Sequence, residues 1–222
     1  MLKRFSFLIV AFALHGFTAA QAAIITTVDR DSFQDALGKG SILNQDFDSI
    51  PVGTVLRTLS GITYVASNGR PIVTDSFLTS TPPNGLGSTS SGFFGNFESA
   101  SFTFASSITA FAIDINTFAP SSGDFTVTLD TGDVVRSTIS TFPNSSTGQF
   151  VGFTSDTAFN SLTIRTSPDP NTGLRYSYTL DSLFYGSASA FTVPEPSSLT
   201  LCGVAGLVGL IFARRRRGRL LD

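Results

Sequence analysis

Residues 125–139 read FTVTLDTGDVVRSTI. Apolar Phe125, Val127 and Leu129 alternate with polar residues, which is the two-residue period of a β-strand with one buried face. The turn residues DTGD follow at 130–133, and β-branched residues return at 134–139. We therefore expect an antiparallel hairpin over this stretch.

The same alternation recurs on both sides of the hairpin. Thr and Ser occupy the polar positions and Phe and Ile the apolar ones, as in antiparallel sheets with one solvated face. The chain is therefore expected to be all-β, an antiparallel two-sheet sandwich of jelly-roll type. The other predicted strands are 42–47, 61–65, 72–77, 100–105, 108–117, 150–153, 162–165 and 176–185, and residues 79–92, rich in Ser, Thr, Pro and Gly, are expected to form a long loop.

One short helix is expected ahead of the strands, at residues 27–38. Phe33, Ala36 and Leu37 have the spacing of a helical apolar stripe that would lie on the body of the domain. Asp29 or Asp31 can cap the start of this helix, and a glycine ends it.

The N-terminal residues have the organisation of a secretory signal peptide. Lys3 and Arg4 precede an apolar run over 5–17, and the small-residue site Ala-Gln-Ala follows at 20–22. This order predicts export through the Sec machinery and cleavage by signal peptidase. We divide the chain into a signal peptide at 1–22, a β-sandwich domain at 23–190 and a C-terminal tail at 193–219.

The tail reads VPEPSSLTLCGVAGLVGLIFARRRRGR. Its apolar part, 199–213, would be roughly 25 Å long as a helix, a little short of the ~30 Å hydrocarbon core of a bilayer. We therefore predict a C-terminal transmembrane helix. Arginines bias their flank to the cytoplasm, so the cluster that follows is expected to stop transfer. This cluster consists of Arg214, Arg215, Arg216 and Arg217.

The tail resembles the PEP-CTERM sorting signal of Gram-negative bacteria. The resemblance is carried by Pro194, Glu195 and Pro196, by the apolar run and by the arginine cluster, in that order. It implies an exosortase as partner, which would recognise the three motif residues in a membrane-anchored precursor. The mature form would then lie in the cell envelope, on the outer surface or outside the cell. The resemblance also implies a bacterium that makes exopolysaccharide.

Removal of both ends changes the chemistry that remains. The single histidine, His15, and the single cysteine, Cys202, lie in the ends, so a Ser-His-Asp triad, a Cys-His pair and a His/Cys zinc site are excluded from 23–190. Seven of the 14 Lys and Arg are removed but only two of the 16 Asp and Glu, which leaves a net charge near −7. Such a surface repels phosphate backbones, so nucleic acid is not an expected partner.

Three aspartates are the candidate metal ligands. Asp46 and Asp48 are two residues apart on a predicted strand and would share a face, and Asp181 lies on the last strand. First and last strands are often neighbours in jelly rolls, so these oxygens could converge on a structural Ca²⁺. The alternative is that the first two simply form the wet face of an edge strand. No other cofactor is expected.

Three functions remain open at this point. The first is a non-enzymatic structural or adhesive role in an extracellular, polysaccharide-containing matrix. The second is a carbohydrate-binding module, which would need an aromatic platform. Tyr176 and Tyr178 share a face, but two tyrosines at this spacing indicate packing more than a sugar site. The third is a glycoside hydrolase, which needs only two carboxylates. We expect no enzymatic activity, because an acid in a strand sandwich is usually a surface charge.

Overall fold

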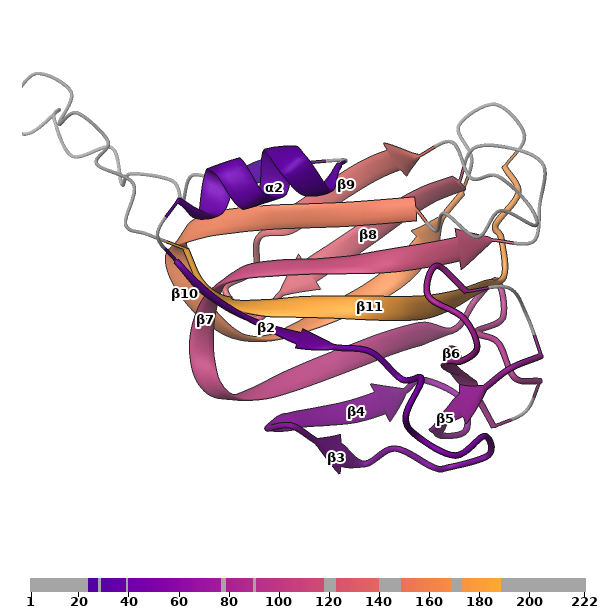
Figure 1. Cartoon of the computed structure of the whole chain (residues 1–222). Helices are drawn as coiled ribbons and strands as arrows, with labels where there is room; N and C mark the ends of the chain where they lie inside the picture. The colour runs from indigo at the N-terminus through magenta and orange to yellow at the C-terminus, as the bar shows by residue number, and fades with distance from the viewer. Residues whose placement is uncertain are drawn as a thin grey trace, which may run out of the picture. The chain divides into compact units, whose positions relative to one another are not determined.

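The computed structural model of the chain describes residues 24–27, 29–38, 40–76, 79–89, 91–117, 123–139, 149–168 and 173–188 (Figure 1). The chain divides into two compact units, Met1–Ser189 and Ala190–Asp222, and every described residue belongs to the first. The predicted signal peptide, transmembrane helix and sorting residues all lie outside the described residues. Within the described ranges, no helix is both long and apolar enough to cross a membrane.

The described strands pair antiparallel in one hydrogen-bonded sheet of eleven strands. The main path of the sheet runs β5-β6-β11-β7-β10-β8-β9, with β1 joined to β10, β2 to β11, and β3 through β4 to β7. The bounds are β1 Ile24–Thr27, β2 Ser41–Gln45, β3 Thr58–Leu59, β4 Ile62–Ala66, β5 Pro71–Thr74, β6 Gly85–Ser88, β7 Ser99–Thr117, β8 Gly123–Leu129, β9 Val134–Ile139, β10 Gln149–Ser167 and β11 Tyr178–Ser187.

Two long strands fold this sheet into two layers. β7 and β10 each have 19 residues, and Figure 1 shows β7 turning back on itself at the side of the view where it is labelled. The second half of β7 pairs with β11 and with the first half of β10, whereas the first half pairs with β4 and with the second half of β10. Register shifts in β10 between Thr154 and Ser161 accompany the bend, as expected of β-bulges.

The prediction of an antiparallel all-β fold with one short helix is therefore confirmed. The predicted two-sheet sandwich needs one correction, because its two layers are parts of one continuous sheet. The sequence pattern broke β7 and β10 at the bend, where the alternation changes phase, and so suggested two strands in place of each. Because the backbone pairing continues through the bend, the two layers remain one sheet.

Aromatic side chains fill the space between the layers. Phe102 and Phe104 from the first half of β7 meet Phe111 from the second half, with ring centroids 6.0 and 6.1 Å apart. The ring centroid of Phe153, on β10, lies 5.8 Å from that of Phe111. All four rings are buried. Since each buried aromatic removes a large apolar area from water, these contacts explain how the domain holds together without a disulfide.

Helix α2 (Arg30–Leu37) covers the outer face of the layer that contains β11. The side chain of Asp29 accepts a hydrogen bond from Ser32 N at its start, and Gly38 caps its end, as predicted. Phe33 and Leu37 pack on this face. Gly152 lies beneath the helix, where an added Cβ would come within 2.8 Å of the Phe33 ring. A residue without a side chain is therefore required there.

The predicted hairpin is confirmed as β8 and β9, with Val127 opposite Val135. The predicted loop at 79–92 contains a strand, β6, which the pattern missed. Its sequence GLGS has no strand propensity. Gly87 is present for a steric reason, because a Cβ at this position would lie 2.1 Å from the carbonyl oxygen of Gly92. β1 and β3 were also missed, since both are too short to show a period.

Candidate functional site

Two of the three predicted calcium ligands are placed differently from the prediction, whereas Asp181 lies on the last strand, β11, as expected. β2 ends at Gln45, so Asp46 and Asp48 follow the strand and do not lie on it. The chain turns here because Phe47 is fully buried and its carbonyl accepts a hydrogen bond from Ile50 N at 3.1 Å. The proposed shared strand face for the two carboxylates is therefore wrong. The strand predicted at 42–47 was expected to neighbour the last strand, and this is confirmed, since β2 pairs with β11.

Asp48 and Asp181 both have partners in the protein. The Asp48 carboxylate accepts from Asn84 N at 3.0 Å. Asp181 Oδ2 accepts from Thr81 N and Oγ1, both at 2.8 Å, and from Ser80 Oγ at 3.1 Å, while its Oδ1 accepts from Ser182 N at 2.7 Å. Among the residues that the structure describes, no three His, Cys, Asp or Glu side chains gather where they could hold an ion. A calcium ion on the three predicted aspartates stays a prediction.

Asp181 has a second carboxylate beside it, which the sequence analysis did not single out. Asp114 of β7 lies directly opposite Asp181 in the β11–β7 register, and both side chains are 0% exposed. Arg30, the first residue of α2, forms an ion pair with Asp114 Oδ2. Asp114 Oδ1 has no hydrogen-bond partner in the described part of the chain. The outer face of this layer therefore holds a cluster of two buried carboxylates, Asp114 and Asp181, and the half-exposed Arg30.

Burial governs the protonation of this cluster. The pKa of Asp114 is raised from 3.8 to about 6, chiefly by burial, because the Ser80 hydroxyl and the Arg30 guanidinium, which lower it, do not offset burial and the neighbouring Asp181 charge. The pKa of Asp181 is also raised, chiefly by burial, against the hydrogen bonds from Thr81 that lower it. Two carboxylates that no solvent reaches cannot act on a sugar chain, so this pair does not form the open two-acid cleft of a glycoside hydrolase.

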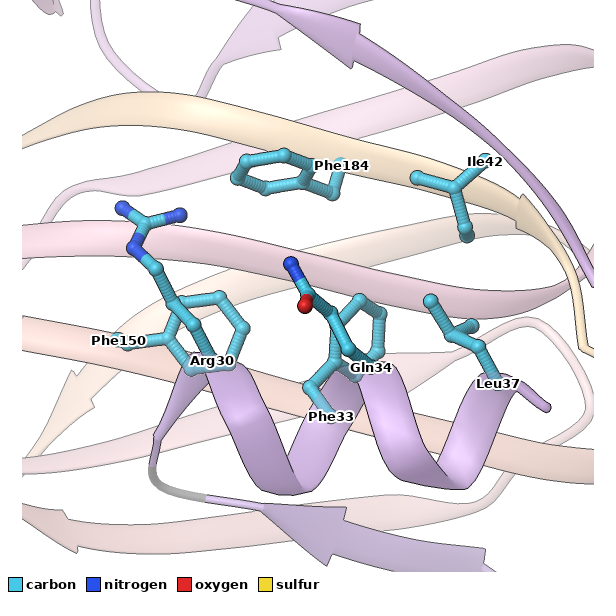
Figure 2. Close-up of a pocket in the computed structure, with 7 residues that line it drawn as sticks. All are labelled: Arg30, Phe33, Gln34, Leu37, Ile42, Phe150 and Phe184. Atoms are coloured by element: carbon cyan, nitrogen blue, oxygen red, sulfur yellow. The ribbon is translucent and has the colours of Figure 1, made fainter.

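Arg30 also borders a groove between α2 and the sheet (Figure 2). Its guanidinium lies 5.1 Å from the ring centroids of both Phe150 and Phe184. The groove has a volume of about 190 Å³ and is lined by Arg30, Phe33, Gln34, Leu37, Ile42, Phe150 and Phe184. Figure 2 shows the side chains of Arg30 and Gln34 reaching from the helix towards the sheet. The groove is smaller than the ~300 Å³ typical of ligand pockets, and its one charged lining residue is already paired.

The outer face of the other layer is rich in hydroxyl groups. We call it the hydroxyl face and define it by Thr63, Ser101, Thr103, Thr128, Ser161 and Thr163. Strand register places these residues in rows, for example Ser101 beside Thr163 and Thr163 beside Thr128. The Ser101 and Thr163 hydroxyl oxygens are 2.8 Å apart. Such a face offers closely spaced donors and acceptors.

The turn at 95–98 lies just before β7, which begins at Ser99, and it presents an aromatic ring. Phe97 is 81% exposed, and the guanidinium of Arg175 lies 5.7 Å from its ring centroid. The predicted packing role of Tyr176 and Tyr178 agrees with the structure, since both are buried. Phe94 is buried as well and stacks on Tyr178 at 5.1 Å.

Sequence reasoning missed Asp114, Arg30 and Phe97. Asp114 sits in the apolar run FAIDINT, where a single acid at a core-like position is a recognisable signal of a buried ion pair. Arg30 is an unusual first residue for a helix, because a cation is unfavourable at that end of the helix dipole. Phe97 lies in the short polar stretch GNFES, and nothing in that pattern distinguishes an exposed ring from a buried one.

Comparison with known protein families locates one match, at the C-terminal end. Residues 192–217 match the family described as the PEP-CTERM protein-sorting motif. The chain carries a PEP-CTERM sorting motif. The motif includes Pro194, Glu195 and Pro196 and the arginine cluster, and it indicates an exported protein with a C-terminal membrane-anchoring sorting signal. The predicted resemblance is thereby confirmed. No curated protein matches the chain in sequence.

Solved structures similar to this chain include carbohydrate-binding modules. The CBM22-1 xylan-binding domain of Paenibacillus barcinonensis Xyn10C has 18% identity, covers 68% of this chain and 97% of its own, and has a TM-score of 0.39. A variant of the family 29 module CBM29-2 has 13% identity, covers 69% and 99%, and has a TM-score of 0.34. A family 6 carbohydrate-binding module has 13% identity, covers 67% and 94%, and has a TM-score of 0.32.

Proposed function

We propose that the protein is a non-enzymatic component of the bacterial cell surface or extracellular matrix, processed by an exosortase and acting in contact with exopolysaccharide. The observation that carries this proposal is the sorting motif at 192–217. A motif of this kind directs a precursor to the membrane and to export, so the function of residues 23–190 is exercised outside the cytoplasm.

The chemistry of the domain supports a non-enzymatic role. Residues 23–190 contain neither histidine nor cysteine, which removes the side chains most used as nucleophiles and general bases at neutral pH. Asp114 and Asp181, the carboxylates with raised pKa values, are closed off from solvent.

The hydroxyl face supports contact with polysaccharide. Strands in a sheet are about 4.8 Å apart, so its rows present hydroxyl groups at regular short intervals across four strands, β4, β7, β10 and β8. A sugar chain also carries closely spaced hydroxyl groups and can exchange hydrogen bonds with such rows, directly or through water.

Cell fractionation tests the proposal. Producing cells are separated into inner membrane, outer envelope and matrix, and the protein is followed with its motif intact and with Pro194, Glu195 and Pro196 changed to Ala. We expect the wild type in the envelope and matrix, released when the exopolysaccharide is digested, and the variant in the inner membrane. A wild type that stays in the inner membrane would refute the proposal.

A second candidate function is that of a carbohydrate-binding module with affinity for a defined glycan. The hydroxyl face favours this candidate. A glycan array tests this alternative. A narrow set of bound glycans would support it, and an array without binding would count against it.

A further inference from the structure

The turn that carries Phe97 is held unusually firmly. Glu98 N donates to Gly95 O at 2.9 Å, and the Glu98 carboxylate accepts from Gly95 N at 2.8 Å, so the turn is closed twice. Thr166 Oγ1 donates to Asn96 O at 2.9 Å, and Tyr178 Oη donates to Glu98 O at 3.2 Å. Because β10 and β11 both anchor the turn, its tip is fixed in place before any ligand arrives.

The residue displayed at that tip is the most exposed large apolar side chain of the described residues. Phe97 is 81% exposed, whereas the other apolar side chains exposed on the described surface are aliphatic and none exceeds 58%. Exposure of a whole Phe side chain forgoes about 2 kcal/mol or more of burial. A rigid turn that bears this cost is typical of a binding anchor, since aromatic anchors contribute most of the binding energy in many interfaces.

A cation stands beside the ring. Arg175 Nη1 donates to Thr166 O at 2.6 Å, and this bond holds the guanidinium 5.7 Å from the Phe97 centroid. A guanidinium has five N–H groups, so the bond to Thr166 leaves donors that can meet an anion in a bidentate way. Arg165 of β10 is exposed and pairs in register with Ser99, two residues after Phe97.

Glu98, which follows Phe97 in the chain, is engaged in holding the turn. Glu98 uses Oε2 on Gly95 N and accepts from Asn68 Nδ2 at 2.9 Å through Oε1. Both of its oxygens thus accept hydrogen bonds, while the Arg175 guanidinium lies beside the ring and Arg165 pairs in register with Ser99. In a domain with a net charge near −7, these two cations favour an anion at this turn.

We propose that Phe97 and Arg175 form a contact site for a carboxylate-bearing sugar of an anionic polysaccharide. The inference rests on the proposed function and specifies the class of polysaccharide. The pyranose ring would stack on the open face of Phe97, and its carboxylate would accept from the Arg175 guanidinium. Asn68 and Asn96, both exposed beside the turn, supply further polar groups for hydroxyls.

A sugar fits this surface better than a membrane or a protein does. One ring surrounded by Asn, Glu and Ser offers far less apolar area than a stable protein interface of about 800 Å² per partner. Insertion into a bilayer generally uses a broad apolar face and not one side chain. A single sugar ring is comparable in size to the exposed Phe ring and requires hydrogen-bonding groups on all sides.

The test uses the full chain, purified in mild detergent, with alginate as the polyuronate probe and dextran as the neutral one. EDTA is present so that calcium cannot bridge alginate to the protein. We expect alginate to bind, dextran not to bind, and affinity to fall as salt rises. Phe97→Ala and Arg175→Gln should each weaken alginate binding about tenfold, which corresponds to the loss of one good contact. Arg175→Lys should restore part of the loss.

Matched controls are Leu43→Ala, an exposed apolar residue on β2, and Arg57→Gln, an exposed arginine just before β3. Both should bind alginate like the wild type. Three results would overturn the inference. They are binding of alginate by Phe97→Ala as tight as by the wild type, binding of dextran as tight as of alginate, and binding of the protein to anionic lipid vesicles in place of alginate. If fractionation places the protein in the matrix while alginate fails to bind, the inference falls and the proposed function stands.

Discussion

The buried pair of Asp114 and Arg30 makes the stability of the domain depend on pH in a predictable direction. Burial raises the pKa of Asp114 from 3.8 to about 6, so the folded state holds its proton more tightly than the unfolded state does. The stabilisation from this proton is fully present below pH 4 and is lost as the pH rises through 6. A rise of about two pKa units corresponds to about 3 kcal/mol in the free energy of unfolding.

Asp114→Asn is the perturbation that isolates this effect, because the amide resembles the protonated acid in shape but cannot ionise. Urea unfolding of the domain at 23–190 would be measured for wild type and variant between pH 4 and pH 8. Between pH 4 and pH 8, the free energy of unfolding of the variant should rise by about 3 kcal/mol relative to that of the wild type. This change is expected whatever the stability of the variant at pH 4. The titration of Asp181 affects the free energy of unfolding of both proteins, so the difference between them reports mainly on Asp114.

Asp75→Asn, at an exposed carboxylate, provides the control for the removal of one charge. The reasoning would be refuted if the difference between Asp114→Asn and wild type changed by less than about 0.5 kcal/mol from pH 4 to pH 8, within the spread seen for ordinary surface substitutions. Such a result would mean that the Arg30 ion pair offsets the burial of the carboxylate.

Three further outcomes follow from the packing and hydrogen bonds. Gly152→Ala should lower the free energy of unfolding by about 1 to 3 kcal/mol, because the new methyl would meet Phe33 and Phe150 at 2.8 Å; urea unfolding against Gly95→Ala, where a methyl would meet nothing closer than 3.5 Å, measures it. Tyr178→Phe should cost about 1 to 3 kcal/mol, since the buried acceptors Glu98 O and Ile164 O lose their donor; an unchanged denaturation midpoint would contradict this. Addition of EGTA should leave the melting temperature unchanged, because Asp181 already accepts four hydrogen bonds; a fall of several degrees would instead support calcium at the predicted aspartates.

Local patterns predicted the elements whose signals lie within a few residues. The helix was found because Phe33, Ala36 and Leu37 repeat at helical spacing between an aspartate cap and a glycine. The β8–β9 hairpin was found because its alternation is regular and DTGD marks the turn. Such elements are specified by contacts near in sequence, so a pattern contains most of the information.

The arrangement of the long strands depended on contacts distant in sequence. At the bends of β7 and β10 the alternation changes phase, and only the pairing of one strand with the other shows that the backbone continues. β6 depends on the close approach of Gly87 to Gly92 and not on strand propensity. Asp46 and Asp48 were assigned to a strand because nothing in the sequence marks its end at Gln45.

The candidate sites show the same limit. Asp181 was singled out from its place on the last strand, but its partner Asp114 became apparent only when the strand register set the two side by side. The contact of Phe97 with Arg175 joins a turn before β7 to a segment just before β11, which are 78 positions apart in the printed numbering. No periodicity connects them.

The intact mass of the mature protein, recovered from the envelope and matrix of producing cells, shows whether the sorting signal is removed. The account predicts a C-terminus at or near Pro194, Glu195 and Pro196, without the arginines at 214–217. Substitution of the three motif residues by Ala should keep those arginines on the chain and the protein in the inner membrane. A wild-type mass that still includes the arginine cluster would contradict the account.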